Sequence, residues 1–211
     1  MELKISSYSF IQKGKIQSTS LSDFEPEEAN CFASFAKQAY RNYKIKYPKF
    51  FKMDPLSKLG FLASEILLDG RKLNEIYPAE RIGVVLQNSH STYDMDKKYH
   101  NTIKDKENYF PSPAVFVYTL PNVMIGEICI RNKFQGENTC FINESPDWEF
   151  LNFYIRNLFE EEKVDACITG WVDASKDDYS AYLFLIEKNE EIKQDNISFN
   201  VSNIGRLLDS N

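Results

Sequence analysis

Apolar and polar positions along the chain change repeatedly between strand-like and helix-like spacing, which favours an α/β layered domain. Residues 3–11 predict a first strand that carries two aromatic side chains. The apolar run at residues 82–87 predicts a strand that is covered on both faces. The remaining predicted strands cover residues 139–143, 164–172, 179–187 and, at an edge of the sheet, 196–201.

Helical periodicity fills most of the intervals between these strands. One helix is predicted over residues 27–46. A second opens with Asp54 as its N-cap and Pro55 in its first turn, and Gly70 stops it. Further helices are predicted from Thr119 to Lys133 and from Ser145 and Pro146 onward, whereas the polar stretch 88–108 predicts a loop with at most one helical turn.

The composition is that of a globular protein with a sizeable core. The chain has 211 residues, of which 43% are hydrophobic and 27% charged, and we predict a single domain over residues 1–211. A net charge of -6 argues against nucleic acid as a partner. No apolar run approaches the roughly 20 residues that cross a bilayer, and the N-terminus lacks the apolar stretch of a signal peptide. We therefore expect a cytoplasmic protein with no membrane span.

The chain offers few residues for a metal site or a disulfide framework. Its four cysteines are isolated from one another, and its two histidines are His90 and His100. Such cysteines are typical of small buried residues, and a zinc site would have to draw heavily on carboxylates. We predict no metal and no cofactor, and we expect both histidines to lie in the solvated loop at residues 88–108.

Several segments, in order and at matching spacing, resemble the N-terminal half of the β-ketoacyl synthases of the thiolase-like superfamily. The most specific is residues 118–131, similar to the family pattern "P-N-x-x-A-G-x-I-A-I-R". The resemblance covers about residues 50–188 and implies a thiolase-like half-domain, a five-stranded mixed sheet with helices on both faces. The other matching segments are residues 52–59, 81–86, 112–113, 134–139 and 164–170.

The chain departs from this family at the nucleophile. Counting from Gly136, the position of the family's active-site cysteine is occupied by Ser145. Serine is a weaker nucleophile that needs an adjacent base, and an N-cap role before Pro146 is the simpler explanation of this residue. The family's second half, which carries two catalytic histidines, has no counterpart in the sequence. The resemblance therefore implies a pseudoenzyme. Cys129 and Cys140 could be considered as displaced nucleophiles, but neither lies at a helix start that would lower the pKa of its thiol, so we expect both to be packing residues.

The resemblance implies a non-catalytic ketosynthase-like subunit, acting like a chain-length factor in fatty-acid or polyketide biosynthesis. Its partner would be a second copy or a ketosynthase-like subunit, with an acyl carrier protein as a further candidate. The alternatives are an acyltransferase or a relative of the 3-oxoacyl-carrier-protein synthases that uses Ser145 with residues from a partner chain, or an acyl-carrier binding module. By resemblance, the strand that pairs across the dimer comprises Thr139, Cys140, Phe141, Ile142 and Asn143.

Overall fold

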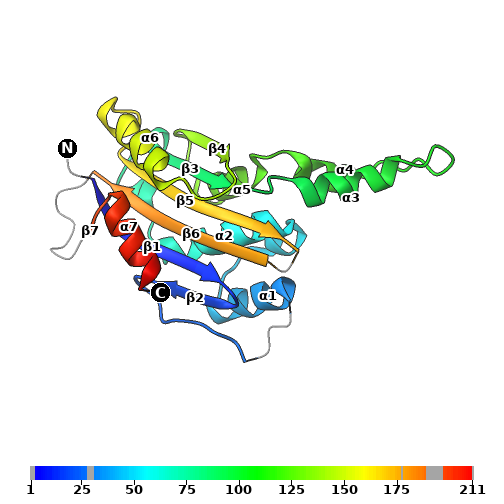
Figure 1. The fold of residues 1–211 in the computed structure, drawn as a ribbon, viewed down its shortest axis with the longest axis horizontal. Coiled ribbons are helices and arrows are strands. Elements are labelled where there is room, and N and C mark those ends of the chain that lie inside the picture. The colour runs from blue at the N-terminus through cyan, green and yellow to red at the C-terminus, as the bar shows by residue number, and fades with distance from the viewer. Residues whose placement is uncertain (1–2, 28–30, 177, 189–196, 211) are drawn as a thin grey trace.

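A computed structural model describes residues 3–27, 31–176, 178–188 and 197–210 (Figure 1). The strands are β1 (Lys4–Gln12), β2 (Lys15–Ser18), β3 (Ile82–Asn88), β4 (Asn138–Ile142), β5 (Ala166–Ser175), β6 (Asp178–Glu187) and β7 (Ile197–Ser198). The helices are α1 (Phe32–Asn42), α2 (Pro55–Leu68), α3 (Tyr93–Ile103), α4 (Pro113–Phe116), α5 (Val123–Asn132), α6 (Trp148–Glu160) and α7 (Val201–Asp209).

These strands form one mixed sheet in the order β2-β1-β6-β5-β3-β4, with β7 paired to β1. Strands β3, β4 and β5 are parallel, and the other pairings are antiparallel. The mixed α/β prediction is confirmed, but the expected number of five strands is too low. The missed strand β2 follows β1 through Lys13 and Gly14, which both have positive φ as a two-residue hairpin turn requires.

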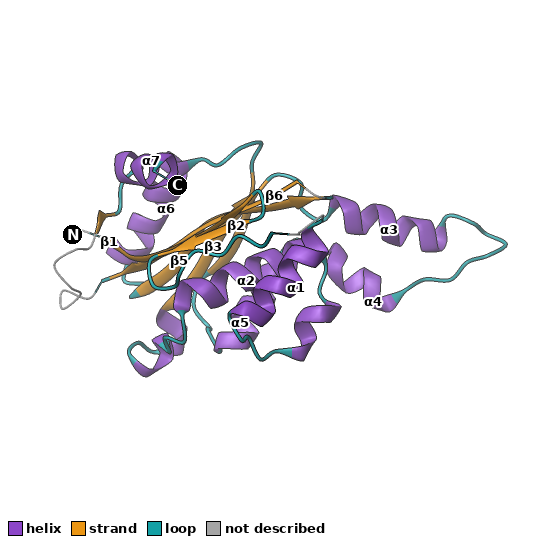
Figure 2. Ribbon diagram, turned by 90° about the horizontal axis from the view of Figure 1, so that it is seen from below, coloured by secondary structure: helices purple, strands orange, loops and turns teal. Residues whose placement is uncertain are grey.

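Helices cover both faces of the sheet, as predicted. Helices α1, α2 and α5 lie on one face, and α6 and α7 lie on the other (Figure 2). The side chains of β3 are buried along its whole length, which explains the apolar run from Ile82 to Leu86. Each face of the sheet therefore has its own hydrophobic cluster.

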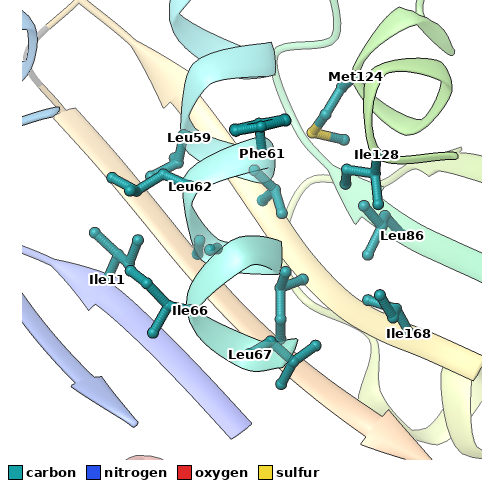
Figure 3. Packing of buried hydrophobic residues seen from close by; sticks show 14 of the residues in the cluster. Ile11, Leu59, Phe61, Leu62, Ile66, Leu67, Leu86, Met124, Ile128 and Ile168 are labelled. Atoms are coloured by element: carbon teal, nitrogen blue, oxygen red, sulfur yellow. The ribbon is translucent and has the colours of Figure 1, made fainter. Parts of the chain in front are cut away.

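Helix α2 is the central element of the first cluster (Figure 3). The Asp54 side chain accepts hydrogen bonds from the backbone N–H of Leu56 (3.0 Å) and of Ser57 (3.3 Å), so the predicted cap is confirmed. An ideal Cβ on Gly60 would lie 2.7 Å from the Met124 side chain, which explains a glycine where α2 and α5 pack together. The helix ends at Leu68, followed by Asp69 and Gly70 with positive φ.

The prediction of a loop at residues 88–108 is wrong, because helix α3 occupies 11 residues of it. With α4 it forms an arm that projects from the sheet (Figures 1 and 2). The ring of Tyr99 lies 5.3 Å from that of Phe116, and Met95 is buried. Met95 and Tyr99 are four residues apart on α3, and such a narrow apolar stripe in a polar sequence is a weak signal for a helix.

Two further elements also differ in their bounds from the predictions. The helix predicted over residues 27–46 is α1, which is shorter, and residues 28–30 lie outside the described part. Of the predicted strand 196–201, residue 196 is likewise outside it, and β7 has only two residues. The chain then enters α7, because the Asn200 side chain caps the helix by accepting from Asn203 N–H.

In the described residues, no single helix is long and apolar enough to cross a membrane. Only a pair bent by 96°, residues 113–119 with α5, meets the length and composition requirement. In α5, Met124, Ile125 and Ile128 are buried in the first cluster, whereas Ile130 is exposed.

Candidate functional site

Ser145 lies in the segment between β4 and α6, at the carboxyl end of the parallel strands. It is exposed and precedes the helix by three residues. The predicted N-cap role of Ser145 is wrong, because Asp147 is the cap and its carboxylate accepts from Phe150 N–H at 2.9 Å. The hydroxyl therefore lies outside the first turn of α6.

Two buried polar residues at the end of β3 hold this segment in place. The Gln87 side chain accepts from Asp147 N–H (2.9 Å) and donates to the Asp147 carbonyl (3.3 Å). The Asn88 carbonyl accepts from Asn143 N–H at 2.9 Å. Both side chains are fully buried at the end of an apolar strand. They fix the path of the chain on either side of Ser145.

His90 does not lie free in a solvated loop. Its Nδ1 atom is 2.7 Å from Oδ2 of Asp173, a residue near the end of β5. The other carboxylate oxygen, Oδ1, accepts from the backbone N–H groups of Ser89 (3.1 Å) and His90 (3.0 Å). Three contacts therefore join the residues after β3 to β5. His100, the other histidine, lies in α3 and not in a loop.

Ser145 and Asp173, the residue that contacts His90, both line a cavity of about 310 Å³. Its wall also contains Trp171 and Tyr182, and two more carboxylates, Glu144 and Asp178. A second cavity of about 510 Å³ lies on the other side of the segment and includes Asp147 and Trp148 (residues 143–149 and 201 line it). Ser145 therefore lines both cavities, next to aromatic side chains and to an acidic rim that includes Glu144 and Asp178.

The Ser145 hydroxyl has no hydrogen bond to any described residue. A serine needs a base to act as a nucleophile, and the fold brings Asp173, the partner of His90, to the cavity that Ser145 lines. The signal was a histidine two residues beyond a buried strand and an aspartate at the end of another. Neither position is informative until the strand order is known.

The two cysteines considered as displaced nucleophiles are packing residues. Cys140 lies in β4 and Cys129 in α5, and both are partly buried against the first cluster. Burial raises the pKa of each thiol to about 11, so neither is a thiolate near neutral pH.

Strand β4 forms one edge of the sheet. It pairs with β3 on one side, and on the other side no strand of the described residues adjoins it. Ile142 is 50% exposed, and the flanking helices expose Ile130 (65%) and Phe153 (64%). Phe141 instead packs inward, with its ring 4.8 Å from that of Phe150. The edge therefore combines open backbone groups with nearby apolar side chains.

No family model and no curated protein matches the sequence. Several solved structures resemble it. The ishigamide ketosynthase/chain length factor aligns over 90% of this chain and 63% of its own, at 16% identity and a TM-score of 0.66. A ketosynthase in complex with its chain length factor, from Xenorhabdus doucetiae, aligns over 90% and 80% of the two chains, at 11% identity and a TM-score of 0.54.

A third similar structure is the complex of a type II polyketide synthase acyl-carrier protein with its ketosynthase, which aligns over 89% of this chain and 62% of the other, at 12% identity and a TM-score of 0.59. The chain therefore spans less than two thirds of the length of this structure and of the ishigamide protein. At such low identities the likeness shows the fold alone. That fold is the thiolase-like fold of the ketosynthases.

Proposed function

We propose that this chain is a ketosynthase-like subunit that does not itself catalyse condensation and acts like a chain-length factor in polyketide or fatty-acid assembly. The observation that carries the proposal is Ser145. By the resemblance of the sequence, it occupies the family's nucleophile position, and in the structure it lies outside α6 and beside Glu144 and Asp147. These two carboxylates oppose the binding of an anionic malonyl group, the donor that condensation needs.

Assembly through β4 is the structural part of this proposal. The five residues of β4 carry no charge, and charges are a common means of blocking an open edge. A second copy of the chain, or a ketosynthase-like subunit, would satisfy the open backbone groups by adding its own strand. The exposed Ile130, Ile142 and Phe153 would then be covered. The proposed interface residues remain Thr139, Cys140, Phe141, Ile142 and Asn143.

An acyl carrier protein is a further proposed partner. One of the similar structures is a complex of such a carrier with its ketosynthase. The acidic rim around Ser145 does not favour an acidic partner at that face, so we place strand pairing before carrier binding.

Replacing Ile142 with Lys tests the interface. This side chain is half exposed, so the change leaves the core intact and places a charge in the proposed contact. We expect the wild-type chain to sediment as a dimer at micromolar concentration and Ile142→Lys to shift it toward the monomer.

Ile76→Lys is the matched control, because Ile76 is 53% exposed and lies outside the proposed interface. It should sediment like the wild type. A wild-type chain that is a monomer at this concentration would contradict self-pairing through β4.

A further inference from the structure

We propose that Ser145, His90 and Asp173 form a serine-dependent site that hydrolyses neutral acyl esters or thioesters. The inference does not depend on the subunit role proposed above. It rests on the position of the residues at the carboxyl ends of three parallel strands. It assigns the base to this chain and not to a partner chain.

The histidine and the aspartate already have the arrangement that a base needs. Asp173 contacts Nδ1 of His90 at 2.7 Å, which leaves Nε2 as the nitrogen that can accept a proton. Backbone N–H groups of Ser89 and His90 hold the second carboxylate oxygen in place. Ser91, the next residue, has a φ of 50°, and its N–H donates to the Asn88 side chain at 3.1 Å. The turn that carries His90 is therefore firmly held.

The sheet brings Ser145 to the same place. Strands β3 and β4 are adjacent and parallel, and Ile142 is in register with Asn88. His90 comes two positions after Asn88, and Ser145 comes three positions after Ile142. Both segments therefore leave the sheet at the carboxyl ends of the parallel strands. The Gln87 side chain then draws the chain across the end of β3, through its two bonds to Asp147. Ser145 consequently shares a cavity with Asp173 on β5.

The cavity indicates the class of substrate. It holds about 310 Å³, with Trp171 and Tyr182 in its wall and Glu144 and Asp178 beside Asp173. Aromatic side chains favour an apolar acyl group, and the carboxylates disfavour an anionic one. The site is therefore suited to short uncharged acyl groups and unsuited to malonyl groups.

The proposed chemistry proceeds in two balanced steps. In the first, Oγ of Ser145 forms a bond to the acyl carbonyl carbon, His90 Nε2 takes its proton, and the bond to the leaving thiol or alcohol breaks as that group receives the proton. In the second, water attacks the acyl-serine and gives a proton to His90. The acid leaves, and the proton returns to Ser145. Contact between base and serine often tightens only with substrate bound.

Covalent labelling tests the site directly. The purified chain is treated with a fluorophosphonate probe, and intact mass with peptide mapping locates the adduct. We expect one adduct on Ser145 and none in Ser145→Ala. In His90→Gln the labelling rate should fall by at least about 100-fold. His100→Gln is the matched control and should label at the wild-type rate.

Two further measurements distinguish a chemical role of His90 and Asp173 from a structural one. Free imidazole should restore labelling to His90→Gly, which a merely structural role of His90 would not allow. Asp173→Asn keeps an oxygen for the two backbone N–H groups but removes the charge, and we expect it to slow labelling at least about tenfold.

The rate of thiol release shows which of two thioesters the protein hydrolyses faster. Butyryl N-acetylcysteamine thioester should be hydrolysed at least about tenfold faster than the malonyl thioester, because of charge repulsion. Absence of an adduct on Ser145, or equal labelling of His90→Gln and the wild type, would overturn the proposal. Neither result bears on pairing through β4.

Discussion

At the scale of single residues, Gly170 shows how strictly a backbone position selects its side chain. Its φ is 145°, and an ideal Cβ there would lie 1.9 Å from the Tyr182 carbonyl oxygen on the neighbouring strand. Only glycine avoids this clash within the sheet. The sequence comparison placed this glycine in a family pattern, and the structure supplies the reason.

Gly170→Ala should therefore destabilise the protein by about 3 kcal/mol or more. Gly205→Ala in α7 is the matched control, because an added Cβ there meets nothing within 4 Å. We expect that control to raise stability by roughly 0.5–1 kcal/mol, since alanine favours a helix. Urea unfolding measures both changes, and a neutral Gly170→Ala would contradict the clash.

The ion pair of Asp165 makes the stability of the protein depend on pH. The Arg81 guanidinium donates to both of its carboxylate oxygens, and this pairing holds the pKa of Asp165 below its ordinary value of 3.8. A lowered pKa in the folded state adds stability above pH 3.8, which is lost as the pH falls through the folded-state pKa.

Asp165→Asn should thus lower the stability of the folded protein at neutral pH. It should also make the loss of stability with falling pH less steep. Thermal unfolding between about pH 2 and 7 measures this. The exposed Asp209→Asn is the control and should leave the curve unchanged. A curve for Asp165→Asn as steep as that of the wild type would count against the ion pair.

At the scale of elements, the start of α6 decides what Ser145 can do. Asp147 caps the helix, and the serine is left in the preceding segment. Asp147→Ala should cost about 1 kcal/mol of stability, because Phe150 N–H loses its partner.

Ser145→Ala should have an effect near zero on the same measurement, because its hydroxyl has no hydrogen bond to the described residues. The pair of variants therefore distinguishes the two caps. Equal losses of stability would restore Ser145 to the capping role that the sequence suggested.

At the scale of the whole molecule, the proposed lack of condensation can be tested by restoring the family's nucleophile. Ser145→Cys should release no carbon dioxide from a malonyl thioester above the wild-type level, because the residue lies outside the first turn of α6 and among carboxylates. A radiolabelled malonyl thioester measures this, and intact mass shows whether the cysteine is acylated. Condensation by this variant would contradict the proposed subunit role.

Hydrophobic periodicity by itself determined much of the fold. The buried run of β3, the capped start of α2 and the long strands β5 and β6 were all predicted, because burial and capping select residues locally. The β1–β2 hairpin and the arm helix α3 were missed, since a four-residue strand and a narrow apolar stripe leave weak periodic signals.

Only the tertiary structure decided the site. The sequence pattern identified Ser145, but it predicted that His90 is a solvated loop residue. It gave no sign of Asp173, which lies 83 positions after His90. What unites the three is the order β4-β3-β5, because these parallel strands of the mixed sheet end on the same side. Strand order results from packing the whole chain around its two clusters, and no local pattern of residues encodes that arrangement.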